Sequence, residues 1–140
     1  MKVYIDENIA PQLAPGLHHL QEPLNNKEKC CCEIISIKDH FGEGVKDEEW
    51  IPIAGKEGAI VITQDLRINS NQQQRLLYLE HGLGIFFFKP PSKTGYLYWD
   101  LVKQVINRWE EIKHLTHKTQ RPFAYKCSSR NNKFELINNE

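Results

Sequence analysis

The sequence predicts an α/β fold: a three-layer α/β/α arrangement with a mainly parallel sheet of four strands, then a long C-terminal helix and a terminal β-hairpin. Its apolar runs are continuous rather than alternating, which is typical of strands buried on both faces. Segments with helical spacing separate these runs, and strands that alternate with helices indicate parallel pairing. The 140 residues can bury a sizeable core, so a single domain over residues 1–140 is expected.

Four short apolar runs, rich in β-branched and aromatic residues, are the predicted strands. In chain order they read "KVYI", "EIISI", "AIVIT" and "GIFFF", at residues 2–5, 33–37, 59–63 and 84–88. Parallel strands need crossover connections, and these crossovers are expected to be right-handed.

A helix over residues 9–20 is expected after the first strand, with Asn8 as its cap. Pro15 and Gly16 should kink or shorten this helix. Residues 21–32 are polar and rich in turn-forming residues, so they are predicted to be a connection to the second strand.

Two further helices should flank the third strand. Residues 38–44 contain two glycines and are predicted to be a loop, after which residues 47–58 have helical spacing with Pro52 inside. Residues 69–82 indicate the next helix, with asparagines available as caps at its start and Gly82 at its end.

The last third of the chain predicts a long helix and a hairpin. From Tyr96 onward, apolar residues recur every three or four positions, as on one face of an amphipathic helix. They are Tyr98, Leu101, Val102, Val105, Trp109 and Ile112. Residues 123–137 hold two short strand-like runs around a polar turn. We therefore expect an acidic-site core over residues 1–90, followed by the helix and a basic hairpin over residues 91–140.

Composition predicts a cytoplasmic protein. The chain is 40% hydrophobic and 26% charged, and it has no apolar run of the roughly 20 residues that span a bilayer. Its first residues lack the architecture of a signal peptide. The cysteines at positions 30–32 and 127 provide neither a disulfide framework nor a zinc spacing, as expected in a reducing compartment.

The net charge of zero hides an asymmetry along the chain. Residues 1–89 carry nine Lys and Arg against thirteen Asp and Glu, whereas residues 90–140 carry nine against five. Scattered solvated charge accounts for this distribution, and so does a site that collects acids for a metal beside a basic rim for an anionic partner.

Carboxylates follow two separate predicted strands. Asp6 comes directly after the first strand, and Asp65 comes shortly after the third. The carboxyl ends of parallel strands meet at one edge, and sites form there where the winding direction changes, so we expect these acids to converge. Asp47, Glu48 and Glu49 open the helix that leads into the third strand, and they can lean over the same edge.

Clustered carboxylates raise one another's pKa unless a cation neutralises them. Mg²⁺ and Mn²⁺ take oxygen ligands of this kind, and Mg²⁺ also pairs with substrate phosphates. Such an ion polarises a phosphoryl oxygen and lowers the pKa of a bound water. The acids therefore indicate phosphodiester hydrolysis.

The same residues are also compatible with simpler roles and with two alternative functions. Asp47 can simply cap its helix, and Asp65 can be a turn residue. A phosphoacceptor receiver domain also has acids after its first and third strands and a Lys-Pro after its last, but only 24 positions separate Asp65 from Lys89, too few for the two helix–strand pairs of that layout. A non-catalytic RNA- or protein-binding module on the same fold is the second alternative.

Basic residues of the hairpin are interleaved with Phe123 and Tyr125, an arrangement that can follow an RNA backbone or stack on a base. An ordinary solvated hairpin has the same composition. Three further basic residues of the core can hold phosphate near the acids. The candidates for RNA contact are Arg67, Arg75, Lys89, Arg121, Lys126, Arg130 and Lys133.

Three motifs, in this order, resemble the PIN-like proteins, relatives of the PIN-domain ribonucleases that serve as toxins in type II toxin–antitoxin pairs. They are Asp6-Glu7-Asn8 after the first strand, "GVKDEEW" from Gly44 to Trp50 at a helix start, and Thr63-Gln64-Asp65 at the end of the third strand. The resemblance covers about residues 2–90.

The resemblance implies an endoribonuclease that hydrolyses RNA with carboxylate-bound Mg²⁺ or Mn²⁺, acting as the toxin of a toxin–antitoxin pair. The catalytic residues and metal ligands that it implies are Asp6, Asp47 and Asp65. Further candidate ligands at the same edge are Glu7, Glu48 and Glu49. The partners that it implies are RNA, a cognate antitoxin protein and a second copy of the chain.

Overall fold

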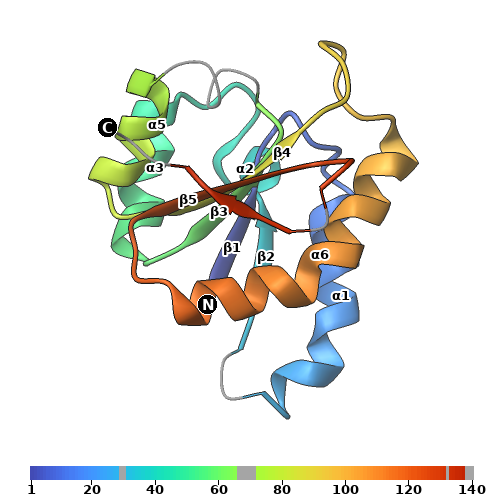
Figure 1. The fold of residues 1–140 in the computed structure, drawn as a ribbon. Coiled ribbons are helices and arrows are strands. Elements are labelled where there is room, and N and C mark those ends of the chain that lie inside the picture. The colour runs from blue at the N-terminus through green and yellow to red at the C-terminus, as the bar shows by residue number, and fades with distance from the viewer. Residues whose placement is uncertain (29–30, 66–71, 132, 138–140) are drawn as a thin grey trace.

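The computed structural model of the chain describes residues 1–28, 31–65, 72–131 and 133–137 (Figure 1). Its strands form one six-stranded sheet. In chain order they are β1 (Lys2–Ile5), β2 (Glu33–Ser36), β3 (Ile60–Thr63), β4 (Gly84–Lys89), β5 (Phe123–Ser128) and β6 (Glu135–Leu136). The predicted α/β fold with a mainly parallel sheet is confirmed, and the hairpin adds two strands to the four predicted ones.

The strands lie in the order β2-β1-β3-β4-β5-β6. All neighbours from β2 to β5 are parallel, and β6 is antiparallel to β5. β5 pairs along its whole length with β4, from Phe123 opposite Gly84 to Ser128 opposite Lys89. β5 and β6 of the hairpin are therefore the last two strands at one edge of the main sheet.

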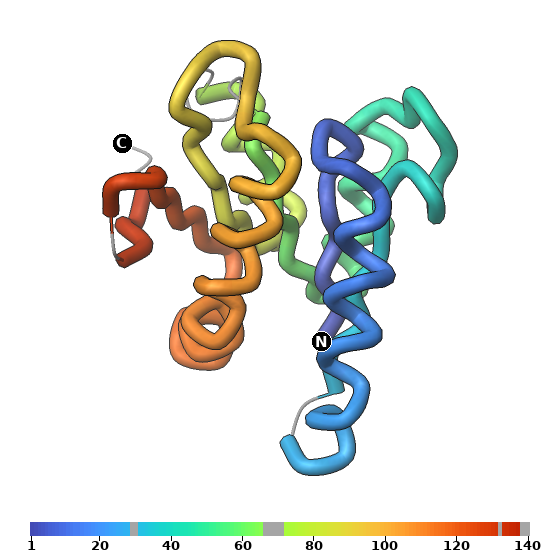
Figure 2. Tube along the Cα trace, turned by 90° about the vertical axis from the view of Figure 1, so that its right-hand side faces the viewer, coloured from blue at the N-terminus to red at the C-terminus, as the bar shows by residue number. Residues whose placement is uncertain are grey.

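The helices are α1 (Leu13–Asn25), α2 (Ile37–Phe41), α3 (Asp47–Lys56), α5 (Gln72–Glu80) and α6 (Tyr98–Lys118). α1 and α6 cover one face of the sheet and α3 and α5 the other, which gives the three predicted layers (Figures 1 and 2). Val3 and Ile5 belong to the first buried cluster, whereas Tyr4 between them belongs to the second, with Trp50 and Tyr78. Both faces of β1 are thus buried, which explains its continuous apolar sequence. None of the described helices is both long and apolar enough to cross a membrane.

Helix α1 differs from its predicted bounds. It begins at Leu13, and Asn8 is not its cap, because the N-cap position is Gln12. Pro15 lies in the first turn, where its missing amide hydrogen has no intrahelical acceptor to lose. The helix therefore continues through Pro15 and Gly16 to Asn25. The helix continues through part of the predicted connection, and Gln21 in this extension is buried.

Helix α2 occupies residues that were predicted to end a strand and form a loop. The Ser36 hydroxyl accepts a hydrogen bond from the Asp39 amide at 3.4 Å and so caps the helix. The predicted helices over residues 47–58 and 69–82 are present as α3 and α5. The asparagines expected to cap the second of them, Asn69 and Asn71, lie outside the described residues.

Helix α6 lies on the same face as α1, although the two crossovers run in opposite directions across the sheet. The β1–α1–β2 and β4–α6–β5 connections therefore have opposite hands. The prediction that all crossovers are right-handed is wrong for one of them. The apolar stripe of α6 is buried against Phe86 and Phe88 of β4, which face this side of the sheet. The stripe residues buried there are Leu101, Val105, Trp109 and Ile112.

The winding direction changes at β1, whose neighbours are β2 on one side and β3 on the other. The chain therefore leaves the carboxyl ends of β1 and β3 in different directions, and a crevice opens between them. The Asp6 amide donates a hydrogen bond to the Ile62 carbonyl at 3.0 Å, so this residue continues the pairing with β3. The first predicted acid thus lies at the mouth of this crevice.

Candidate functional site

Asp6 is the most deeply placed acid at this edge, with 8% of its surface exposed. Its Oδ1 accepts a hydrogen bond from the Glu7 amide at 2.8 Å, and its Oδ2 accepts one from the Thr63 hydroxyl at 2.7 Å. The Thr63 oxygen in turn accepts the Asp65 amide hydrogen at 3.0 Å. Thr63 therefore connects the segments that carry the two strand-end acids.

Burial raises the pKa of Asp6 to about 6. The hydrogen bonds from the Thr63 hydroxyl and the Glu7 amide act in the opposite direction, because they favour the charged carboxylate. The charges of Asp65 and Asp47 raise the pKa of Asp6 further. A cation in this place would relieve both the burial and the repulsion.

Four of the six predicted acids line one pocket of about 240 Å³. The residues around this acidic pocket are Asp6, Glu7, Asn8, Ile37, Asp47, Trp50 and Asp65. Asp6 comes from the end of β1, Asp65 from the end of β3, and Asp47 from the first turn of α3, where the helix dipole favours an acid. The convergence expected from the sheet edge is therefore present as a shared pocket.

The Asp47 carboxylate is held away from a common ligand position. Its Oδ1 accepts a hydrogen bond from the Trp50 indole at 3.1 Å, and its Oδ2 accepts one from the Gln74 amide of α5. Among the described residues, no three His, Cys, Asp or Glu side chains lie close enough to hold a metal ion. Asp47 would have to exchange these two donors for a metal to join Asp6 and Asp65.

The other acidic candidates are more exposed. Glu7 lines the acidic pocket, and its Oε2 accepts a hydrogen bond from the Gly44 amide at 3.2 Å. This bond ties the segment after β1 to the loop before α3. Glu48 and Glu49 are exposed on α3 and are not among the residues that line the pocket.

The basic candidates divide between the two ends of the sheet. Lys89, Lys126 and Arg130 line two adjoining pockets of about 310 and 210 Å³ at the carboxyl end of β4 and β5. We call these the basic pockets. Arg121 lies at the opposite end of β5, where a Cβ atom on Gly58 would come within 2.8 Å of its Nη2. Parallel pairing with β4 separates Arg121 from Lys126.

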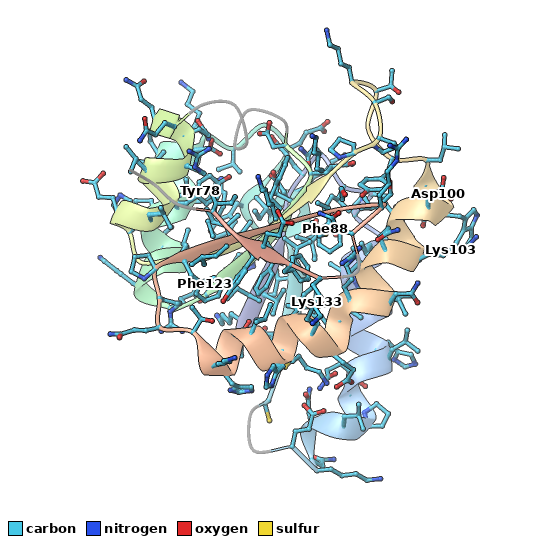
Figure 3. The ribbon with its side chains drawn as sticks, in the orientation of Figure 1. Tyr78, Phe88, Asp100, Lys103, Phe123 and Lys133 are labelled. Atoms are coloured by element: carbon cyan, nitrogen blue, oxygen red, sulfur yellow. The ribbon has the colours of Figure 1, made fainter. Side chains whose placement is uncertain are left out.

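The remaining basic candidates stand apart from these pockets. Lys133 is exposed in the connection between β5 and β6 (Figure 3), and Arg75 is half-buried on α5. Neither residue lines the acidic or the basic pockets. Arg67 lies outside the described residues.

Gln64 is a site residue that had no separate signal in the sequence. Its Nε2 donates to the Asn8 carbonyl at 2.9 Å, and its Oε1 accepts from the Tyr96 amide at 3.2 Å. It joins the ends of β1 and β3 to the segment before α6. It also lines a pocket of about 290 Å³ with Asp65 and Lys93, which we call the linking pocket. Only the long-range fold shows this role, because its partners are far apart in sequence.

The family model described as "PIN like domain" matches residues 1–90. This match covers β1 to β4 and every acid of the pocket. No curated protein and no solved structure matches the chain.

Proposed function

This chain belongs to the PIN-like domain family, whose fold is in general that of a nuclease, and we propose that it is a metal-dependent endoribonuclease. The observation that best supports this activity is the acidic pocket at the change of winding direction. There the buried Asp6, with its raised pKa, shares one pocket with Asp65 and Asp47. Such a group of acids is best stabilised by a hard cation.

The donor set of the pocket fits Mg²⁺ or Mn²⁺, because the acids offer oxygen atoms only. The proposed metal ligands are Asp6, Asp65 and, after release from Trp50 and Gln74, Asp47. When bound, the ion supplies a polarised phosphoryl oxygen and a water of lowered pKa. The chain's own part is to hold the three carboxylates charged, and Thr63 contributes to this through its bond to Asp6.

RNA is the proposed substrate, since the family suggests RNA binding and the chain offers cations beside the acids. Lys89, Lys126 and Arg130 surround the basic pockets at the same edge of the sheet. We propose that they bind the phosphates of a strand whose scissile bond lies at Asp6 and Asp65. We propose that the whole chain acts as one domain, in which β5 and the segment after it add Lys126 and Arg130 to this edge of the sheet.

The finer role that we propose is that of a cytoplasmic toxin, inhibited by a cognate antitoxin protein and able to form a homodimer. The motif resemblance supports this role. A small gene for a DNA-binding protein next to this one would support it further. Expression in a cell should arrest growth, and Asp65→Asn should relieve the arrest.

A second candidate is a non-catalytic RNA-binding module on the same fold. The hydrogen bonds of Asp47 to Trp50 and Gln74 favour it, because they satisfy this carboxylate without a metal. Fold by itself does not establish catalysis.

The deciding experiment incubates purified protein with a mixed RNA pool, in Mn²⁺ and in EDTA. We expect the wild type to cleave only with Mn²⁺ and to leave 5′-phosphate ends. Asp65→Asn keeps the size of the side chain but removes a charge, so cleavage should be lost while the circular dichroism spectrum stays unchanged. Asp39→Asn, at an exposed carboxylate of α2, is the matched control and should cleave normally.

Two results would contradict the nuclease proposal. Cleavage that persists in EDTA or in Asp65→Asn would mean a contaminant or a metal-free mechanism. Binding of Mn²⁺ and RNA without any cleavage would establish the non-catalytic module.

A further inference from the structure

The start of α6 exposes aromatic side chains close to the candidate site. Tyr98 is 47% exposed and Trp99 is 67% exposed, and their rings meet edge to face with centroids 5.2 Å apart. Leu97 before them is 76% exposed. Asp100 and Lys103 extend from the outer side of the same helix (Figure 3). Isolated apolar side chains are common on protein surfaces, whereas a group of exposed aromatic side chains beside a pocket indicates a binding site.

A pocket of about 200 Å³ lies beside Tyr98. We call it the aromatic pocket. Its inner wall is apolar and buried, its rim is aromatic, and it has an amide at one side. The inner wall is formed by Ile9, Leu13 and Leu101, and the rim by Tyr96 and Tyr98. The amide is that of Gln64.

The aromatic pocket is continuous with the acids. It shares Asn8 and Gln64 with the linking pocket, and the linking pocket shares Asn8 and Asp65 with the acidic pocket. Lys93 lies on the linking pocket, between the aromatic rim and the acids. A ligand with a flat apolar part followed by an anionic part beside Lys93 fits this series of pockets. A cation at the acidic pocket would attract the anionic part.

From this arrangement we infer that the aromatic pocket binds one unpaired nucleobase next to the phosphate held at the acidic pocket. The inference rests on the proposed function and adds a base-binding subsite at the start of α6. A base stacks on Tyr98, as bases stack on aromatic side chains in other single-strand sites. Its polar edge meets Gln64, whose amide keeps a second donor hydrogen beside the one given to Asn8.

This arrangement selects against duplex RNA. A paired base is stacked within its own helix and has its hydrogen-bonding edge occupied, so entry to the pocket requires it to leave the stack. A pocket of this size holds one base rather than a duplex end. Selection therefore comes from the start of α6, outside residues 1–90 that match the family.

The test measures binding without cleavage. The full chain is titrated in EDTA with a short, unstructured, fluorescein-labelled oligoribonucleotide, and the stacking contact is removed first from the protein and then from the RNA. Tyr98→Ala should weaken binding about tenfold, the effect of losing one aromatic stack. Ile106→Ala changes another exposed apolar residue of α6, 44% exposed, and should leave binding unchanged.

The reciprocal change is made in the RNA. A series of oligonucleotides, each with one abasic position, should contain one member that wild-type protein binds about tenfold more weakly. Tyr98→Ala should bind this member and the intact strand equally well. Trp99 is exposed, whereas the other two tryptophans, Trp50 and Trp109, are buried. A change in tryptophan fluorescence on adding unlabelled RNA therefore reports binding near Tyr98 independently of the label.

The outcomes separate this inference from the nuclease proposal. If wild type and Tyr98→Ala bind and cleave RNA equally, the base pocket is wrong and the nuclease stands. If the abasic effect depends on Tyr98 but Mn²⁺ gives no cleavage, the pocket stands and the nuclease fails. Equal binding of single-stranded and duplex RNA, or no RNA binding at all, would overturn the inference. If this surface binds a protein instead, no RNA binding will be observed.

Discussion

The Thr63 hydroxyl donates a 2.7 Å hydrogen bond to Asp6 Oδ2, across the crevice between the ends of β3 and β1. The same oxygen accepts the amide hydrogen of Asp65 at 3.0 Å. The bond to Asp6 favours its charged form, whereas burial favours the neutral form and raises the pKa to about 6. Thr63 thus contributes to the charge that the pocket holds near neutral pH.

Thr63→Val should raise the pKa of Asp6 above its present value of about 6. The change removes the donor and leaves the carboxylate buried, so the charged form loses stability. We expect the acid limb of the cleavage pH profile to move upward by about one pH unit. NMR titration of the Asp6 carboxyl checks the assignment. The control is Thr116→Val on α6, where the hydroxyl bonds to the Ile112 carbonyl, outside the pockets of the site. An unmoved acid limb would contradict the role of this bond.

Asp6→Asn should stabilise the protein in EDTA at pH 8. The ordinary aspartate pKa is 3.8, and burial raises that of Asp6 to about 6. As pH rises through this window, the unfolded chain ionises before the folded one, so the wild type loses stability until about pH 6 and then stays level. The loss is on the order of 3 kcal/mol at most, and asparagine avoids it.

The check is urea unfolding of both proteins across this pH range. The difference between them should be full at pH 8 and should vanish at pH 3, where Asp6 is neutral in both states. Added Mn²⁺ should stabilise the wild type more than Asp6→Asn. A difference that does not change with pH would mean that packing, rather than charge, separates the two proteins.

Gln74→Ala should tighten Mn²⁺ binding. The Gln74 amide bonds to Asp47 Oδ2, and a metal must displace it before Asp47 can join Asp6 and Asp65. Removing a hydrogen bond to a charged group should improve affinity by about tenfold. Calorimetric titration measures this, with Gln73→Ala at the exposed neighbouring position as control. Unchanged affinity would exclude Asp47 as a ligand.

Lys126→Ala and Arg130→Ala should each weaken RNA binding and flatten its dependence on salt. Each phosphate contact with a single strand contributes about 0.7 to the slope of log Kd against log salt concentration. Arg121→Ala should leave the slope unchanged, because Arg121 lies beside Gly58 at the far end of β5. Equal effects of all three changes would indicate general attraction by positive charge, instead of specific contacts of the RNA with Lys126 and Arg130.

Gln21→Leu should destabilise the fold by about 1–3 kcal/mol. The buried Oε1 of Gln21 on α1 accepts hydrogen bonds from the Trp109 indole at 2.9 Å and the Lys113 ammonium at 3.2 Å, both on α6. Leucine would leave the indole donor buried without its partner. Urea unfolding measures the change, and the exposed His19→Ala should stay within about 0.5 kcal/mol of wild type. A neutral Gln21→Leu would mean that apolar packing alone holds α6.

Local patterns were enough to predict the strands and the strand-end acids. The strands β1, β3 and β4 are buried on both faces, so their apolar runs are continuous and recognisable without any partner. Once the strands are parallel, Asp6 and Asp65 must lie at the same edge. This conclusion follows from chain direction alone. The position of the acidic pocket could therefore be predicted from Asp6 and Asp65 without the tertiary structure.

Tertiary structure decided what depends on surfaces that are far apart in sequence. Gln21 in the last turns of α1 finds its buried partners on α6. The apolar stripe of α6 covers the face of Phe86 and Phe88, and this placement gives its crossover the opposite hand. Parallel pairing of β5 with β4 carries Lys126 towards the acids and leaves Arg121 at the other end.

The orientation of each site side chain was also a tertiary decision. Trp50 and Gln74 hold the Asp47 carboxylate, and Gln64 reaches Asn8 and Tyr96. Helical period and strand propensity are properties of neighbouring residues, so they predict where an element lies and which of its faces is apolar. The partner that buries this face, and the donor that a carboxylate meets there, depend on the free energy of packing the whole chain.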